Sequence, residues 1–124
     1  MILADTSIWV DHIRHRDDML VDALEHGRII MHPLVIGELA MGDLPRRGLF
    51  LDALGNLRRA VIADHDEVLR LVNDRQLHGQ GTGYVDAHLL ASSMLTPDTR
   101  FWTRDVRLSA IAERLSVGQF PANR

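Results

Sequence analysis

The chain has 124 residues, of which 46% are hydrophobic and 25% charged, and this size and composition are typical of a single soluble globular domain. It contains no cysteine, which excludes disulfides, zinc ribbons and thiol catalysis. All 14 basic residues are arginine, which excludes lysine-based phosphate loops and Schiff bases, and the formal net charge of −3 does not by itself indicate a nucleic-acid-binding protein.

We expect one domain over residues 1–124, located in the cytoplasm and not attached to a membrane. The start of the chain lacks a basic segment, and Asp5 interrupts its apolar run, which is unlike a signal peptide. No apolar run approaches the roughly 18 residues that a membrane-spanning helix needs.

The first half of the chain alternates short apolar runs with segments of helical pattern. Pro33 is tolerated in the first turn of a helix, and Gly27 and Gly42 are suited to end one. In chain order we expect a strand at Ile2–Ala4, helices at 7–13 and 17–26, a strand at Ile29–Met31, and helices at 33–41 and 46–56.

The second half continues the alternation after a third apolar run. The glycine-rich segment 79–83 predicts a flexible break, and Thr96-Pro97 predicts the end of a helix. In chain order we expect a strand at 60–62, helices at 64–78 and Tyr84–Leu95, a strand centred on Phe101 and Trp102, a helix at 106–115, and a weak fifth strand at 116–120. The whole pattern predicts an α/β fold, a three-layer sandwich with a central parallel sheet of four to five short strands flanked by helices.

Two acids, Asp5 and Asp105, follow expected strands. Ligands of open α/β sheets usually bind beyond the carboxyl ends of the strands, so both carboxylates are candidates for a functional site. The alternative is local: Asp5 lies in a good helix-start sequence, and Thr103 can cap the last helix with Asp105 in its first turn.

Two further acids, Glu38 and Asp86, lie on helices among apolar neighbours. Leu89 and Leu90 share a face with Asp86, and an ionised carboxylate on a buried face costs several kcal/mol unless it is paired. The alternatives are that Asp86 serves the helix dipole and that Glu38 is a surface glutamate at the helix edge.

Taken together, the four acids predict a shared site at the carboxyl edge of the sheet. Carboxylates crowded together repel one another unless a cation lies between them. A set of ligands made only of oxygen suits Mg²⁺ or Mn²⁺ better than zinc.

Four segments of the chain resemble the acidic motifs of PIN-domain ribonucleases, in order and in spacing. They are Met1-Ile-Leu-Ala-Asp5-Thr-Ser, Ile36-Gly-Glu38-Leu, Tyr84-Val-Asp86-Ala-His-Leu-Leu-Ala-Ser and Trp102-Thr-Arg-Asp105. The resemblance covers nearly the whole chain, and its length is similar to that of VapC-type toxins of bacterial toxin–antitoxin pairs.

This resemblance implies a PIN-like fold and a Mg²⁺- or Mn²⁺-dependent endoribonuclease that leaves a 5′-phosphate and a 3′-hydroxyl. It implies that the metal is held by the four acids Asp5, Glu38, Asp86 and Asp105. Thr103 would order this cluster, and Thr6 or Ser7 would assist. Some family members carry a further acid after the fourth, whereas Val106, Arg107 and Leu108 follow here, so a second metal ion is in doubt.

The resemblance also implies partners. These are an RNA substrate, a second copy of the chain in a homodimer, and a VapB-like antitoxin that covers the acidic pocket. Four apolar residues are candidates for such interfaces, although core packing is the commoner fate of such residues: Leu44, Leu49, Phe50 and Leu54. The alternatives to a ribonuclease are a catalytically silent PIN-like module that binds RNA or protein, and a metal-dependent nuclease that acts on DNA.

An acidic site does not attract RNA unaided, so arginines are expected to contact phosphates. Arg104 and Arg107 follow the fourth expected strand, close to the predicted metal. Arginines also bracket the segment 48–57, where an ordinary solvated helix face is the alternative explanation: Arg46, Arg47, Arg58 and Arg59.

The seven histidines do not form a zinc-hydrolase motif, because His-Glu-x-x-His is absent and His12-x-x-His15 is the tightest pair. His88, two residues after Asp86, is expected to pack or to lie on the surface.

Overall fold

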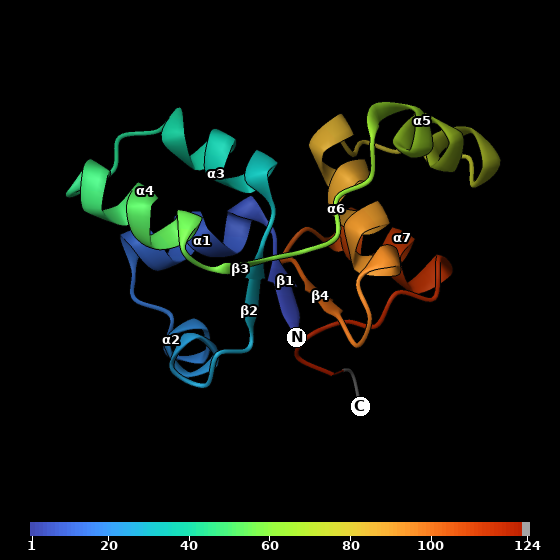
Figure 1. The fold of residues 1–124 in the computed structure, drawn as a ribbon. Coiled ribbons are helices and arrows are strands. Elements are labelled where there is room, and N and C mark those ends of the chain that lie inside the picture. The colour runs from blue at the N-terminus through green and yellow to red at the C-terminus, as the bar shows by residue number, and fades with distance from the viewer. Residues whose placement is uncertain (123–124) are drawn as a thin grey trace.

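The computed structural model describes residues 1–122. In this part of the chain four parallel strands form one sheet in the order β3-β2-β1-β4 (Figure 1). The strands are β1 (Ile2–Ala4), β2 (Ile29–Met31), β3 (Arg58–Arg59) and β4 (Arg100–Trp102). Leu3 of the central strand β1 is level with Ile30 of β2 and with Phe101 of β4. Since all strands run in the same direction, their carboxyl ends share one edge of the sheet.

Helices cover both faces of this sheet, as Figure 1 shows. One layer contains α1 (Thr6–Arg14), α2 (Asp18–Glu25), α3 (Pro33–Ala40) and α4 (Arg47–Gly55). The other contains α5 (His65–Asp74), α6 (Tyr84–Leu95) and α7 (Val106–Arg114). The predicted three-layer sandwich with a parallel central sheet is confirmed.

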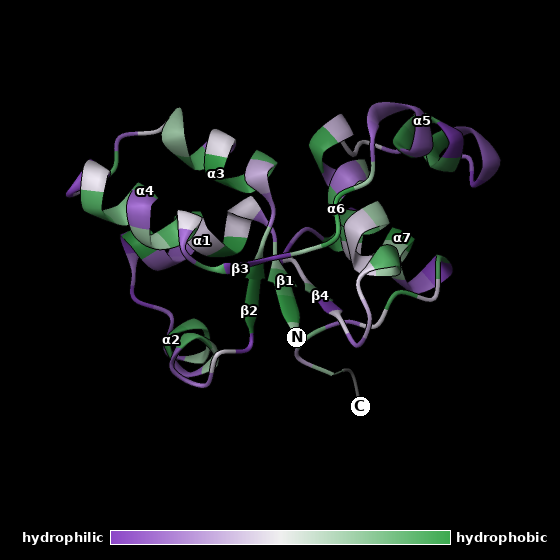
Figure 2. Cartoon of the chain, in the orientation of Figure 1, coloured by the Kyte–Doolittle hydropathy of each residue, from purple (hydrophilic) through white to green (hydrophobic). Residues whose placement is uncertain are grey.

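The two inner strands are apolar because helices bury them on both sides. Every residue of β1 and β2 is at most 3% exposed, and Figure 2 shows both strands as hydrophobic, whereas α5 is largely hydrophilic. The helix α6 is also deeply buried, with all seven residues from Ala87 to Ser93 inside. None of the helices in the described residues is long and apolar enough to cross a bilayer.

The predicted third strand at 60–62 is wrong. The strand is β3, two residues earlier, and it pairs with β2 through Met31 and Arg59. Ala60 still donates its N–H to the carbonyl of Met31, but Val61 and Ile62 leave the sheet and are 46% and 45% exposed. An edge strand pairs through its backbone, so its side chains can be exposed arginines. The apolar run at 60–62 therefore did not indicate where the strand lies.

The predicted helix at 64–78 is too long, because α5 ends at Asp74. Gln76 adopts a left-handed conformation with φ 54°, and Leu77 turns back to donate its N–H to the carbonyl of Val72. Leu77 thereby becomes buried to 5% exposure.

Two smaller predictions need correction. The segment 116–120 forms one parallel bridge, between Gln119 and Phe101, rather than a full fifth strand. Leu54 is 3% exposed and belongs to the core, so it is not available as part of an interface. Leu49, on the same helix, is 71% exposed.

Candidate functional site

Asp5 lies at the carboxyl end of the central strand and caps α1. Its Oδ1 accepts hydrogen bonds from the Ser7 hydroxyl and from the N–H of Ile8, the latter at 3.3 Å. Its Oδ2 accepts one from the Thr103 hydroxyl. The side chain is therefore held on both oxygens, and the residue is only 4% exposed. Asp5 therefore caps the start of a helix, as the local alternative predicts. The same position places its carboxylate at the carboxyl edge of the sheet, as the site hypothesis predicts.

Thr103 connects the ends of β1 and β4. While its hydroxyl donates to Asp5, the same oxygen accepts the N–H of Asp105 at 3.1 Å. Asp105, rather than Thr103, caps α7, since its Oδ1 accepts the N–H groups of Arg107 and Leu108 at 2.9 and 3.1 Å. One threonine therefore orients two acids that lie far apart in the sequence.

Glu38 is exposed on α3 and faces the start of α1. The Thr6 hydroxyl donates to its Oε1 at 2.5 Å. This bond joins two elements that follow neighbouring strands, β1 and β2. Glu38 is therefore more than a surface glutamate at the helix edge, because its carboxylate is held by the Thr6 hydroxyl of α1.

Asp86 is half-buried in the first turn of α6, where the N–H of Gly83 donates to its Oδ2 at 3.1 Å. Its pKa is raised above the ordinary value. Burial is the largest cause and the hydrogen bond from Gly83 opposes it, while the negative charges of Asp5, Asp105 and Glu38 raise it further. The four predicted acids thus lie within electrostatic reach of one another.

The donor set fits a divalent cation in its chemistry. Among residues 1–122, three of the acids keep one oxygen without a hydrogen-bond partner: Oε2 of Glu38, Oδ1 of Asp86 and Oδ2 of Asp105. Oxygen donors of this kind are those that Mg²⁺ and Mn²⁺ prefer. Within the same residues, however, no three acidic or histidine side chains form a ready-made ligand group, so an ion at this edge would require the carboxylates to shift toward it.

The predicted phosphate-binding arginines have different surroundings. Arg104 forms ion pairs with Asp11 and Asp17, so its charge is engaged within the protein. The side chain of Arg107 lies over Gly81, and a β-carbon there would be 2.3 Å from its Nη1. Arg59 ends β3 at the carboxyl edge. Two others are exposed at the start of α4, away from any strand end: Arg46 and Arg47.

A row of four ring side chains near the site is not indicated by the sequence motifs. His32 follows β2, and the row continues through His88 and Tyr84 to His65. The register that pairs Leu3 with Ile30 places His32 level with Asp5. In the sequence, Tyr84 lies at a helix start two residues before Asp86, which is the one signal that could have pointed to it.

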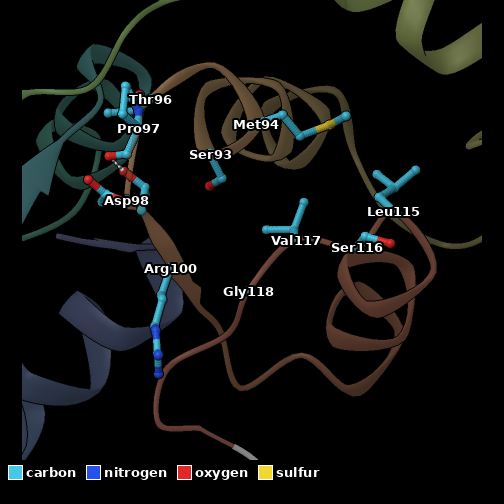
Figure 3. Close-up of a pocket in the computed structure, with 11 residues that line it drawn as sticks. Ser93, Met94, Thr96, Pro97, Asp98, Arg100, Leu115, Ser116, Val117 and Gly118 are labelled. Carbon is cyan, nitrogen blue, oxygen red and sulfur yellow. Dashed lines mark hydrogen bonds between the residues drawn. The ribbon is translucent and has the colours of Figure 1, made fainter.

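A hollow of about 710 Å³ lies at the opposite end of β4 (Figure 3). It is lined by residues that precede β4, begin it or follow α7, including Asp98, Arg100 and Val117. No acid of the cluster borders it. A smaller hollow of about 330 Å³, between α1 and α3, does include Glu38 among mostly apolar residues. Size alone therefore does not locate the acidic site.

Comparison with known proteins agrees with the geometry. The PIN domain family model matches residues 2–114. Ribonuclease VapC32 from two strains of Mycobacterium tuberculosis, CDC 1551 / Oshkosh and ATCC 25618 / H37Rv, is 51% identical to the chain over 117 residues, which is 94% of this chain and 94% of the relative. A match of this extent, on a parallel sheet with acids gathered at its carboxyl edge, shows that the chain belongs to the PIN domain family.

Proposed function

We propose that this protein is a Mg²⁺- or Mn²⁺-dependent endoribonuclease that hydrolyses RNA phosphodiester bonds. The observation that carries the proposal is the gathering of four carboxylates from four parts of the chain, where Thr103 contacts Asp5 and Asp105, Thr6 holds Glu38, and the half-buried Asp86 faces the charges of the other three. Such an arrangement is unfavourable without a cation and is typical of metal sites. The VapC32 relatives bear the name ribonuclease, which favours RNA as the substrate.

In this proposal Asp5, Glu38, Asp86 and Asp105 hold the ion. The ion would supply an activated water and neutralise charge on the phosphate that is cleaved. The free Oε2 of Glu38 can accept a hydrogen bond from the attacking water.

Hydroxyl groups keep these acids in place. Thr103 and Ser7 fix Asp5, so that its position does not depend on the ion alone. Thr6 fixes Glu38 from the neighbouring element. Supports of this kind are often as important to a metal site as the ligands themselves.

Substrate phosphates are proposed to contact Arg107 and Arg59, which lie beside the site and form no ion pair within residues 1–122. Arg46 and Arg47 are proposed as more distant contacts. Arg104 is a weaker candidate than the sequence indicated, because binding RNA would have to replace its ion pairs with Asp11 and Asp17.

We further propose a cytoplasmic toxin, folded as one domain, that forms a homodimer and is inhibited by a VapB-like antitoxin. The similarity to VapC32 supports this. The apolar hollow beside Glu38, between α1 and α3, offers a surface from which a partner protein would reach the acidic cluster.

The deciding experiment compares Asp86→Asn with the unchanged protein on total RNA, in Mg²⁺ or Mn²⁺ and in a chelator. We expect the variant to lose cleavage by about 100-fold or more, the scale seen when one electrostatic contact to a charged transition state is removed. Asp52→Asn, at an exposed acid on α4, is the matched control and should cleave normally.

Thermal unfolding provides a second readout of the same site. In a chelator, Asp86→Asn should be at least as stable as the unchanged protein, because the raised pKa means that the ionised carboxylate disfavours the folded state. Mg²⁺ or Mn²⁺ should raise the melting temperature of the unchanged protein more than that of the variant. Cleavage of DNA instead of RNA would identify a deoxyribonuclease, and metal binding without cleavage of either would identify a silent binding module.

A further inference from the structure

Tyr84 is the one exposed residue among the six aromatic residues of the chain. Three of the others, Trp9, Phe101 and Trp102, are at most 3% exposed, and the two remaining phenylalanines are partly buried. Tyr84 is 44% exposed. Tyr84 is therefore the aromatic ring that a ligand can reach most easily.

The ring of Tyr84 is braced on two sides. It packs edge-on against His88 with ring centres 4.7 Å apart and planes at 90°. Its hydroxyl is hydrogen-bonded to Nδ1 of His65 on α5 at 2.5 Å. His88 is buried and packs in turn against His32. The exposed part of the ring is therefore held in one orientation before any ligand arrives.

The braced ring lies at the same end of α6 as Asp86. Tyr84 is the first residue of α6, and Asp86 in the same turn is hydrogen-bonded back to Gly83. Through His88 and His32, the row leads to the carboxyl edge of the sheet, level with Asp5.

The charge of the site favours a contact with RNA that does not depend on charge, in addition to the proposed phosphate contacts of Arg107 and Arg59. Four carboxylates repel a polyanion, the chain carries a net charge of −3, and the nearby Arg104 is already paired with Asp11 and Asp17. Stacking of a base on an aromatic ring does not depend on charge and is tolerant of sequence, because every base has a π-face.

We infer that Tyr84 stacks on an unpaired base beside the scissile phosphate and thereby selects single-stranded RNA; this inference rests on the proposed nuclease function. In a duplex both faces of a base are covered by its neighbours, so a paired segment cannot offer a face to the ring. His65 is a positioning residue, since it touches Tyr84 rather than the substrate.

The test measures binding of a short RNA pool of randomised sequence, single-stranded or as a duplex, in a chelator so that cleavage does not interfere. We expect Tyr84→Ala and Tyr84→Leu to weaken binding of the single strand by about 5- to 150-fold and to leave duplex binding unchanged. Tyr84→Phe keeps the ring and should bind nearly as well as the unchanged protein. Leu95→Ala is the matched control, at a residue of similar exposure at the other end of α6.

The positioning role of His65 has its own readout. His65→Ala and Tyr84→Phe both remove the hydrogen bond to the hydroxyl, so each should weaken single-strand binding slightly, and the double variant should be no weaker than either alone. A base that fluoresces when unstacked, 2-aminopurine, placed in the pool should be quenched by the unchanged protein and not by Tyr84→Ala.

The outcomes separate the two proposals. Binding that depends on Tyr84 without any cleavage would overturn the nuclease proposal and retain the stacking proposal. Cleavage together with equal binding by Tyr84→Ala and the unchanged protein would overturn only the stacking. The stacking proposal would also be overturned if the unchanged protein bound single strand and duplex with equal affinity, or bound neither.

Discussion

His32 shows how the environment of one residue sets its charge. It is 1% exposed, and burial, followed by the charges of His88 and Arg59, lowers its pKa from 6.5 to about 4. Its Nδ1 accepts the N–H of Leu34 at 3.0 Å, which assigns the proton of the neutral ring to Nε2. Nε2 has no partner within the described residues. The folded protein therefore favours the neutral form of the His32 ring.

The depressed pKa of His32 predicts a loss of stability in acid. The unfolded chain binds a proton to this ring below about pH 6.5, whereas the folded protein resists doing so down to about pH 4. The free energy of unfolding should therefore be unaffected above pH 6.5 and should fall between these values, by up to about 3 kcal/mol.

Urea unfolding of the metal-free protein across this range is the measurement. His32→Asn is the control, because an asparagine oxygen can still accept the N–H of Leu34 but does not titrate. The difference between the two proteins isolates His32 from Asp86, whose raised pKa acts in the opposite direction. A difference that does not change between pH 4 and 6.5 would contradict this account.

Among the elements, α6 is the most enclosed helix. Its middle is buried on all sides, so two serines are forced into an apolar environment. Ser93 donates its hydroxyl to the carbonyl of Leu89 at 2.9 Å. The hydroxyl of Ser92 is fully buried and has no partner among residues 1–122.

We therefore expect Ser92→Ala to stabilise the protein by about 1 kcal/mol, because it removes an unpaired buried hydroxyl and introduces a better helix former. Ser93→Ala improves helix propensity equally but removes an existing hydrogen bond, so it should gain less. Chemical denaturation of both variants gives the comparison. An equal gain from both would mean that the Ser92 hydroxyl costs nothing in the native protein.

The reach of sequence-based prediction also differs between elements. The bounds of α6 were predicted correctly because glycine precedes it and Thr96-Pro97 follows it, which are local signals. The end of α5 was missed because Gln76 turns left-handed to bury Leu77, a demand of tertiary packing. The strand β3 was missed because an edge strand pairs through its backbone, and its arginines carry no apolar pattern.

For the whole molecule, the placement of the four acids near one another could be predicted because each lies in a motif that the family resemblance orders. The resemblance also indicated Thr103, Thr6 and Ser7 as supporting residues, but not which acid each one contacts. The ion pairs of Arg104 and the contacts of the ring row between His65 and Tyr84 and between His32 and His88 were not predicted, because they join segments distant in sequence. No short pattern encodes such contacts, because they exist only once the sheet has assembled.

The proposed single domain predicts a single unfolding transition. Trp9 and Trp102 both lie in the main core, while α5 and α6 enclose a smaller cluster around Val68. Urea curves followed by tryptophan fluorescence and by far-UV circular dichroism should superimpose, with an m value of about 1–3 kcal/mol/M. A circular dichroism transition that begins earlier would show that α5 separates from the rest first.

The position of β1 at the centre of the sheet also matters while the ribosome is still making the chain. Asp5 and Thr103, which meet across β1 and β4, are 98 residues apart, so at ordinary translation rates about 5 to 20 seconds separate their synthesis. Until then one side of β1 has no neighbouring strand, and the last acid has not been added. Until Asp105 has been translated, a nascent copy of the proposed nuclease lacks one of the four acids and cannot assemble the site that would cleave the messenger that encodes it.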